Sequence, residues 1–272
     1  MKVLIIITAS IAVKKSMKVV KTLKDKNVFV DCILTDKAKK LVNINKLKSS
    51  IKGRVYTNAS EKNNKMLHIL LTRKSSLIVV LPATANIIAK FANGFADDLA
   101  STSLIAANKQ IIFVPAMNHE MWNNSTNTHN VKKLIKKGVE FIGPEYGNLS
   151  CGEVGLGRIS DENKISNVIL DYLNRTNKLS GKKCIVTAGP TIESIDMVRY
   201  ISNNSSGKQG YEIAKQLSLS GAKVILITGP VNISKPTNLK TIGVRTALEM
   251  DAAVQKNLPC DIAVFTAAVS DI

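Results

Sequence analysis

Short apolar runs rich in β-branched residues alternate along this chain with longer stretches of helical periodicity. In the first half these runs cover residues 3–7, 28–34, 77–81 and 111–114. Runs that are apolar throughout, rather than at every second residue, are typical of parallel strands that helices bury on both faces. The sequence therefore predicts an α/β fold built on a doubly wound parallel sheet.

The second half of the chain repeats the alternation. Runs at residues 183–187, 223–228 and 261–267 follow a polar segment that ends in Gly181. We therefore expect two tandem Rossmann-like domains, residues 1–175 and 183–272, joined by a linker at 176–182. In a doubly wound sheet the run at 261–267 would lead into a crossover helix and further strands, so the second domain is expected to be incomplete.

The charge balance limits the partners. The 272 residues include 38 Lys and Arg against 20 Asp and Glu, which gives a formal charge of +18. The lysines are spread along the chain, and no aromatic platform accompanies them. We therefore predict a solvated basic surface that is compatible with an anionic small-molecule substrate, and no nucleic-acid partner.

Targeting and metal signals are weak. The first ten residues hold one lysine and a short apolar run, which is typical of a buried strand rather than a signal peptide, and no apolar stretch is long enough to span a bilayer. The cysteines show no C-x-x-C spacing, and together with the histidines they form no metal-ligand pattern. A cytoplasmic protein without a membrane or metal partner is expected.

Polar residues follow the predicted strands, where open α/β sheets bind their ligands. The first loop, Thr8-Ala-Ser10-Ile11, lacks the glycines of a dinucleotide-binding G-x-G-x-x-G loop. The third strand ends in Pro82-Ala-Thr84-Ala-Asn86. Taken singly these residues are typical of helix caps, and Ser10 in particular is expected to be an N-cap.

The segment Pro115-Ala-Met-Asn118-His-Glu-Met121-Trp122 is more specific. It resembles the substrate-recognition motif of the flavin-dependent cysteine decarboxylases, above all those that act on phosphopantothenoylcysteine in coenzyme A synthesis. His68 and Cys151 match the histidine and the flap cysteine of that family. The first loop has Ala9 where the family usually has glycine.

The resemblance implies a set of site residues. His68, Asn118 and Cys151 would be catalytic, and Asn118, Met121 and Arg158 would bind substrate. Flavin mononucleotide (FMN) would be bound by residues from several loops, namely Ser10, Ile11, Thr35, Thr84, Asn86, Ser101, Thr102 and Met117. Because the family builds its flavin site between neighbouring subunits, the resemblance also implies a trimer-based homo-oligomer.

The family's mechanism can be carried over to these positions. The flavin would oxidise the cysteine thiol of the substrate to a thioaldehyde, which allows carbon dioxide to leave. His68 would act as the base, Asn118 would hold the carboxylate, and Cys151 would supply a proton when hydride returns to the enethiol. The net reaction would be redox-neutral.

The residues themselves leave other interpretations open. Apart from the resemblance, a histidine among apolar neighbours such as His68 is typical of a core or edge position. Cys151 lies in a glycine-rich segment near Arg158, where a thiol is accessible, whereas Cys32, Cys184 and Cys260 lie in apolar runs and are expected to be inert core thiols.

A second resemblance lies in the second half. The motifs that start at Thr187-Ala-Gly-Pro and at Arg199-Tyr-Ile-Ser-Asn are similar to the beginning of the phosphopantothenate-cysteine ligases, which use CTP and Mg²⁺. The implied nucleotide and intermediate residues are Gly189, Arg199, Asn203, Ser205, Ser206, Gly207 and Asp271. The family's lysine-rich loop would follow Asp271, so this ligase half is expected to be inactive alone.

Two rival hypotheses remain. One is a related flavoprotein that decarboxylates another C-terminal cysteine, such as that of a peptide. The other is a non-catalytic or decayed flavin-binding subunit that acts only by association. The ligase motifs argue against the first rival, and the presence of His68, Asn118 and Cys151 argues against the second.

Overall fold

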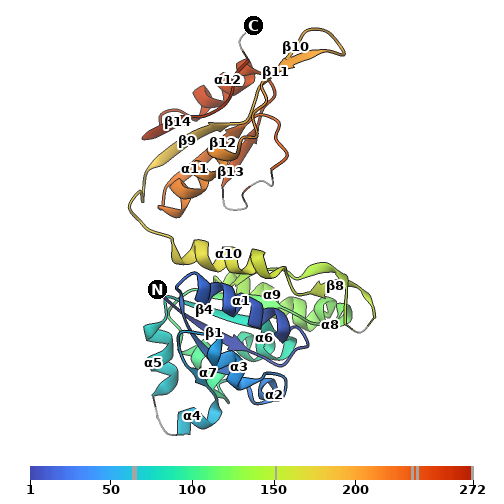
Figure 1. Cartoon of the computed structure of the whole chain (residues 1–272), viewed down its shortest axis with the longest axis vertical. Coiled ribbons are helices and arrows are strands. Elements are labelled where there is room, and N and C mark those ends of the chain that lie inside the picture. The colour runs from blue at the N-terminus through green and yellow to red at the C-terminus, as the bar shows by residue number, and fades with distance from the viewer. Residues whose placement is uncertain (63–65, 151, 234–235, 237–238, 271–272) are drawn as a thin grey trace. The chain divides into compact units, whose positions relative to one another are not determined.

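The structure is a computed structural model, and it describes residues 1–62, 66–150, 152–233, 236 and 239–270. Its contacts divide the chain into two compact units, Met1–Leu173 and Asn174–Ile272. Figure 1 shows the helices and strands of each unit. The two units are described separately.

The first unit alternates strands and helices. Its elements are β1 (Lys2–Ile7), α1 (Val13–Asp25), β2 (Phe29–Leu34), α2 (Asp36–Lys39), α3 (Ile44–Ser49), β3 (Val55–Tyr56), α4 (Asn58–Lys62), α5 (Leu67–Lys74), β4 (Leu77–Ala83), α6 (Ala85–Ala92), α7 (Leu99–Ile105), β5 (Ile111–Pro115), α8 (His119–Asn123), α9 (Ser125–Lys136), β6 (Glu140–Phe141), β7 (Glu145–Asn148), β8 (Val154–Arg158) and α10 (Glu162–Leu173).

Six strands of this unit form a parallel sheet in the order β3-β2-β1-β4-β5-β6. The chain runs outward from β1 toward β3 on one side and from β4 toward β6 on the other, so the order reverses between β1 and β4. This is the doubly wound arrangement, and it confirms the predicted fold class.

The sheet is buried because successive side chains point to opposite faces. On one face Val3, Ile5 and Ile7 of β1 pack in a cluster with residues of α1 and α10, and those two helices lie side by side in Figure 1. On the other face Leu4 and Ile6 pack with residues of α5, α6, α7 and α9. Both faces of β1 are therefore core, which is why the strand is apolar throughout.

Several short strands were not predicted. β3 and β6 have only two residues each, and they sit at the two edges of the sheet. β7 and β8 pair antiparallel and make a hairpin apart from the main sheet. Their sequences are polar or rich in glycine, so they carry no apolar signal.

The second unit has a smaller sheet, and it also confirms the prediction of a parallel α/β unit. Its strands follow the order β13-β12-β9-β14, all parallel, with α11 on one face and α12 on the other. Its elements are β9 (Lys183–Ala188), β10 (Ile192–Ser194), β11 (Tyr200–Ser202), α11 (Lys208–Leu219), β12 (Lys223–Thr228), β13 (Lys240–Gly243), α12 (Ala247–Asn257) and β14 (Ile262–Phe265).

The segment expected to be a linker bonds to the second unit. Thr176 N–H donates to Leu219 O over 2.7 Å, and Leu179 N–H donates to Ser220 O over 2.8 Å. These bonds fix the segment at the end of α11.

The three described cysteines differ in their surroundings. Cys32 and Cys184 are fully buried in strands, and burial raises the pKa of both thiols, in keeping with inert core positions. Cys260 was expected to be a core thiol, but that expectation is wrong. It precedes β14 and is only half-buried, because the strand begins at Ile262.

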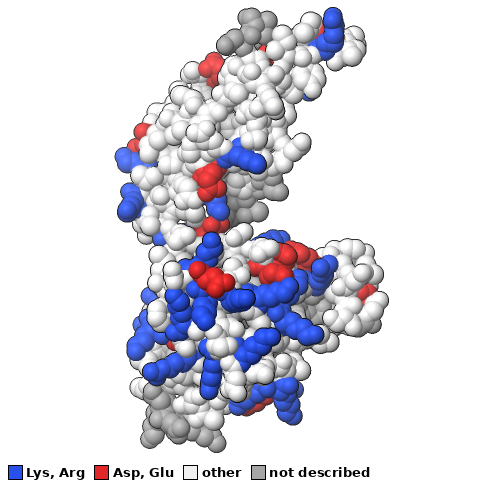
Figure 2. Space-filling model, in the orientation of Figure 1, with Lys and Arg blue, Asp and Glu red and all other residues white. Residues whose placement is uncertain are grey.

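Charged side chains cover much of the first unit's surface. In the face that Figure 2 shows, Lys and Arg are spread widely over this unit and acidic residues are few. Some lysines are paired, for example Lys18 with Glu162 at 2.7 Å. Within the part of the chain that the structure describes, no helix is long and apolar enough to cross a membrane, and no group of three or more acidic, His or Cys residues could hold a metal ion.

Phe113 tests the packing of the first unit. It is fully buried in β5, with its ring 5.9 Å from Phe91 and 5.5 Å from Phe141, so Phe113→Ala should lower the free energy of unfolding by about 3–5 kcal/mol. Phe95→Ala, at a side chain that is 59% exposed, should change it by about 0.5 kcal/mol or less. Urea unfolding followed by the fluorescence of Trp122, the chain's one tryptophan, measures both in this unit. Equal losses would contradict the packing.

Candidate functional site

The ends of β1 and β4 are joined at the point where the strand order reverses. Thr8 is buried just after β1, and its Oγ1 donates to Pro82 O over 2.7 Å and lies 3.4 Å from Thr84 Oγ1. In open α/β sheets this reversal opens a crevice beyond the carboxyl ends of the strands. The sheet topology therefore places the candidate site here.

Two helices begin at this crevice without side-chain caps. Ala12 precedes α1 and Thr84 precedes α6, and neither caps its helix through a side chain. Neither helix has an acidic residue in its first turn. The positive end of each helix dipole therefore favours an anion at this edge.

Ser10 was expected to be the N-cap of α1, and that expectation is wrong. Ala12 occupies the cap position, and Ser10 Oγ accepts from the N–H of Ala12 over 3.3 Å in the turn before the helix. Ala9 forms this turn without a left-handed backbone, since Asn27 is the only residue other than glycine with positive φ in the described ranges. The turn therefore does not require glycine at position 9.

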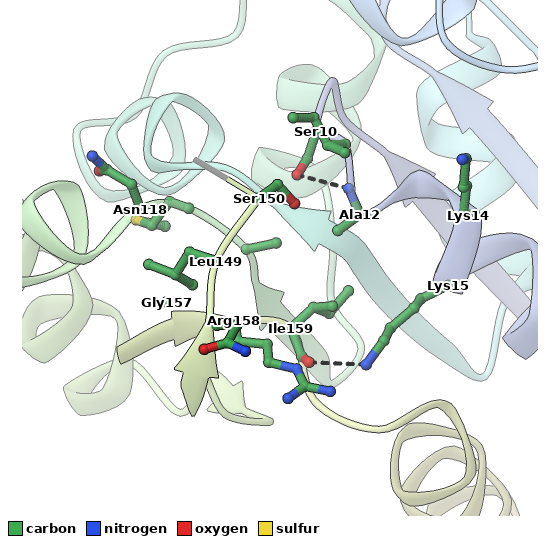
Figure 3. Close-up of a pocket in the computed structure, with 14 residues that line it drawn as sticks. Ser10, Ala12, Lys14, Lys15, Asn118, Leu149, Ser150, Gly157, Arg158 and Ile159 are labelled. Atoms are coloured by element: carbon green, nitrogen blue, oxygen red, sulfur yellow. Dashed lines mark hydrogen bonds between the residues drawn. The ribbon is translucent and has the colours of Figure 1, made fainter. Parts of the chain in front are cut away.

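A cavity of about 330 Å³ opens beside this turn. In Figure 3 Ser10 lies above it, Asn118 to the left, Lys14 and Lys15 to the right and Arg158 below. Its described lining includes no acidic residue, and it comprises Ser10, Ile11, Ala12, Lys14, Lys15, Ala116, Met117, Asn118, Asn148, Leu149, Ser150, Gly157, Arg158 and Ile159. The cavity therefore suits an anionic ligand.

The cations at this cavity have different roles. Lys15 Nζ lies 3.3 Å from both Ile159 O and Ser160 O, and 3.9 Å from Glu162 Oε2. Its ammonium therefore ties the start of α1 to the chain that follows β8. Lys14 and Arg158 have no such carbonyl bonds among the described residues, so their charges are available to a ligand.

Asn118 connects β5 to α8. Its Oδ1 accepts from the N–H of Met121 over 2.9 Å and so caps α8. This bond fixes the side chain and leaves the amide NH₂ group, two hydrogen-bond donors, for a ligand. An N-cap here therefore also orients a polar group at the cavity.

The hairpin of β7 and β8 packs against the Asn118 turn. Met117 N–H donates to Gly157 O over 3.1 Å. A Cβ on Gly157 would lie only 2.2 Å from Met117 O, so glycine is required for this close approach. Burial raises the pKa of Glu145 at the base of the hairpin, but Lys164, 3.0 Å away, outweighs burial and holds that pKa below its ordinary value.

The structure brings together only part of the predicted site. Ser10, Ile11, Met117, Asn118 and Arg158 line the cavity. Thr35 and Thr84 follow β2 and β4, Asn86 lies in α6, Thr102 in α7 and Met121 in α8, and none of these lines it. Ser101 is fully buried, and its hydroxyl bonds to Asp98 in the capping box of α7.

The two remaining predicted catalytic residues lie elsewhere. His68 is half-buried on α5 and is not among the residues that line the cavity. Cys151 lies outside the described residues. Sequence reasoning missed Lys14 and Lys15 at the site, although their place within one turn after the Ser10 loop could have indicated them.

The predicted ligase residues gather at the corresponding reversal of the second sheet. Asn203 Nδ2 donates to Val269 O over 2.9 Å, and Ser205 Oγ accepts from Gly207 N–H over 3.3 Å. A Cβ on Gly207 would lie 3.3 Å from Gly189 N, so these two glycine backbones are close. Arg199 instead pairs with Asp196 at 2.7 Å, Ser206 follows Ser205 in the same loop, and Asp271 lies outside the described residues.

Comparison with known proteins places this geometry in a family. Residues 1–174 match the family model described as Flavoprotein, and residues 179–272 match the model described as DNA/pantothenate metabolism flavoprotein C-terminal domain. The chain belongs to the flavoprotein family. This confirms the flavoprotein resemblance of the first half.

Relatives and solved structures agree with this flavoprotein assignment. The coenzyme A biosynthesis bifunctional protein CoaBC of Haemophilus influenzae is 37% identical over 269 residues, which are 97% of this chain and 67% of the relative. A mutant PPC decarboxylase complexed with pantothenoylaminoethenethiol is 26% identical with a TM-score of 0.58, over 63% of this chain and 97% of its own. The FMN binding protein AtHal3 is 27% identical with a TM-score of 0.55, over 62% and 94%.

Gly157 tests the contact between the hairpin and the Asn118 turn. Gly157→Ala should push β8 away from Met117 O and raise the hydrogen-exchange rate of the Met117 amide about tenfold or more, because that amide loses its acceptor. Gly94→Ala is the control, since Gly94 also has positive φ but has no atom within 4 Å of an added Cβ. Amide exchange measured by NMR reports both. An unchanged Met117 rate in Gly157→Ala would contradict the close contact.

Proposed function

We propose that the first unit is an FMN-dependent decarboxylase that converts 4'-phosphopantothenoylcysteine to 4'-phosphopantetheine in coenzyme A biosynthesis. The observation that carries this proposal is the Asn118 turn, whose side-chain amide caps α8 and stands at a cation-lined cavity beside the uncapped start of α1. The names of the relatives and of the similar structures support the same reaction.

The residues at the crevice fit FMN. A flavin phosphate needs hydrogen-bond donors and positive charge without nearby carboxylates, and the starts of α1 and α6, the Ser10 hydroxyl and Lys14 provide these. Thr84 and Met117 stand at the neighbouring strand ends. When bound, FMN supplies the reversible two-electron oxidation of the substrate thiol.

The chain's own residues bind and orient the substrate. The amide NH₂ group of Asn118 donates to the departing carboxylate, and Arg158 neutralises an anionic group of the substrate at the same cavity. Enclosure by the β7 and β8 hairpin favours loss of neutral carbon dioxide over retention of the charged acid. Met121, exposed on α8, is proposed to contact the substrate.

His68 and Cys151 are proposed to move protons, as base and as proton donor. Since His68 does not line the cavity of its own chain, we propose that a neighbouring copy brings it there in a trimer-based homo-oligomer. Exposed apolar side chains lie beside it: Met66, just before α5, and Ile69 and Leu70 on α5 are 62%, 37% and 40% exposed. Such a surface supports a subunit contact at α5.

The second unit is proposed to form part of a CTP- and Mg²⁺-dependent phosphopantothenate-cysteine ligase site. Gly189 and Gly207 both pack against Val231, which brings the two loops together, and Asn203 is held nearby by Val269 O. Arg199 would have to exchange Asp196 for a ligand. The free cysteine thiols support a reducing, cytoplasmic setting.

The decarboxylase assignment is tested by carbon dioxide release. The purified chain with FMN should release carbon dioxide from phosphopantothenoylcysteine, and at least about 100-fold more slowly from peptides that end in cysteine, because a peptide lacks the phosphate that Arg158 is proposed to neutralise. Mass spectrometry of the product checks the reaction. Faster turnover of the peptides would overturn the substrate assignment, and no turnover of either would overturn the activity.

Asn118→Asp tests the role of Asn118 in substrate binding without loss of its helix cap. Aspartate keeps the N-cap of α8, so thermal stability should change little, but its carboxylate repels that of the substrate, and kcat/KM should fall about 100-fold or more. The control is Asn124→Asp, at the N-cap of α9, whose Oδ1 accepts from Thr126 N–H away from the cavity. Equal kcat/KM values for the two variants would refute the role of Asn118.

A further inference from the structure

The ring of His119 lies between α8 and β8. His119 is the first residue of α8, directly after Asn118, and it is half-buried. Leu156 N–H donates to His119 Nδ1 over 3.0 Å. Asn123, one turn along α8, has its amide 2.9 Å from Nε2. The ring is thus held on one side by its own helix and on the other by the hairpin.

Besides accepting from Leu156 N–H, Nδ1 lies 3.3 Å from Leu156 O, so both contacts of this nitrogen are to the backbone of β8. The donor from Leu156 is a backbone N–H of β8, so the bond fixes the strand itself rather than a side chain.

Glycine on β8 makes room for the ring. A Cβ on Gly155 would lie 2.5 Å from His119 Nδ1 and 2.6 Å from its Cγ, so the ring rests directly on this backbone. Gly157 lies two residues further on the same face of the strand, and its backbone packs equally closely on Met117 O. One face of β8 is therefore fitted to the Met117–His119 turn. Among the described residues, His119 is the residue of this turn whose side chain bonds to β8.

We propose that His119 is a positioning residue, whose ring holds β8 against the Asn118 turn and so fixes Arg158 across the cavity from Asn118. Arg158 lies two residues after Leu156 and lines the same cavity as Asn118. Without the bond, the hydrogen bond from Met117 N–H to Gly157 O would still join the strand to the turn among the described residues. The effect on substrate binding rests on the proposed function, whereas the effect on β8 does not.

The experiment compares two replacements in this chain with FMN. His119→Asn keeps an acceptor on Cγ, as Nδ1 is, whereas His119→Leu has similar bulk and no acceptor. His129→Leu is the control, because His129 is exposed on α9 and does not line the cavity. The measurements are KM and kcat for phosphopantothenoylcysteine and the hydrogen-exchange rate of the Leu156 amide.

We expect His119→Leu to raise KM and the Leu156 exchange rate about tenfold or more, with kcat changed less than about threefold. His119→Asn should restore both to within about threefold of the wild type, and His129→Leu should match the wild type. Equal behaviour of His119→Leu and the wild type would overturn the proposal. Equal loss in the Leu and Asn variants would also overturn it, because the ring would then act through shape alone.

A second pair of variants keeps the proposal testable if His119→Leu fails to fold. Gly155→Ala should displace the ring and speed exchange of the Leu156 amide, whereas Gly243→Ala, at a glycine with no atom within 4 Å of an added Cβ, should not. An unchanged Leu156 rate in Gly155→Ala would overturn the proposal. If the wild type shows no decarboxylation, the proposed function fails, but the exchange rates still decide the role of His119 at β8.

Discussion

The burial of a parallel sheet on both faces is the constraint on which the first unit depends. Because Val3 to Ile7 must face helices on each side, the chain has to cross over one face and then the other, and it reverses between β1 and β4. That reversal brings the starts of α1 and α6 to one edge of the sheet. The anion-favouring crevice is thus a consequence of how the core is buried rather than a separate feature.

The sequence predicted the parts of the fold that have a hydrophobic signal. β1, β2, β4, β5, β9, β12 and β14 coincide with apolar runs, and the parallel α/β class followed from them. The β7 and β8 hairpin has glycines in place of apolar residues because β8 must approach Met117 and His119 closely. A strand specified by lack of bulk leaves no periodic pattern.

The site was predicted in part for a similar reason. Ser10, Asn118 and Arg158 could be named from motifs, and all three line the cavity. The hydroxyl of Ser101 matched a motif too, but it bonds within the capping box of α7, where only the folded geometry shows its partner. His68 could also be named from a motif, but the sequence does not show where it lies, and within a single chain it does not line the cavity. The bond from Lys15 Nζ to Ile159 O joins residues that are far apart in the sequence, so no local pattern could predict it.

We propose that the crevice between β1 and β4 holds the phosphate of a flavin. Titrating the flavin-free chain with FMN and with riboflavin, which lacks the phosphate, and following the quenching of flavin fluorescence tests it most directly. FMN should bind about 100-fold tighter than riboflavin, as two charge-assisted hydrogen bonds to the phosphate would provide, and the difference should shrink as salt is added. Equal affinity for the two flavins would contradict the account.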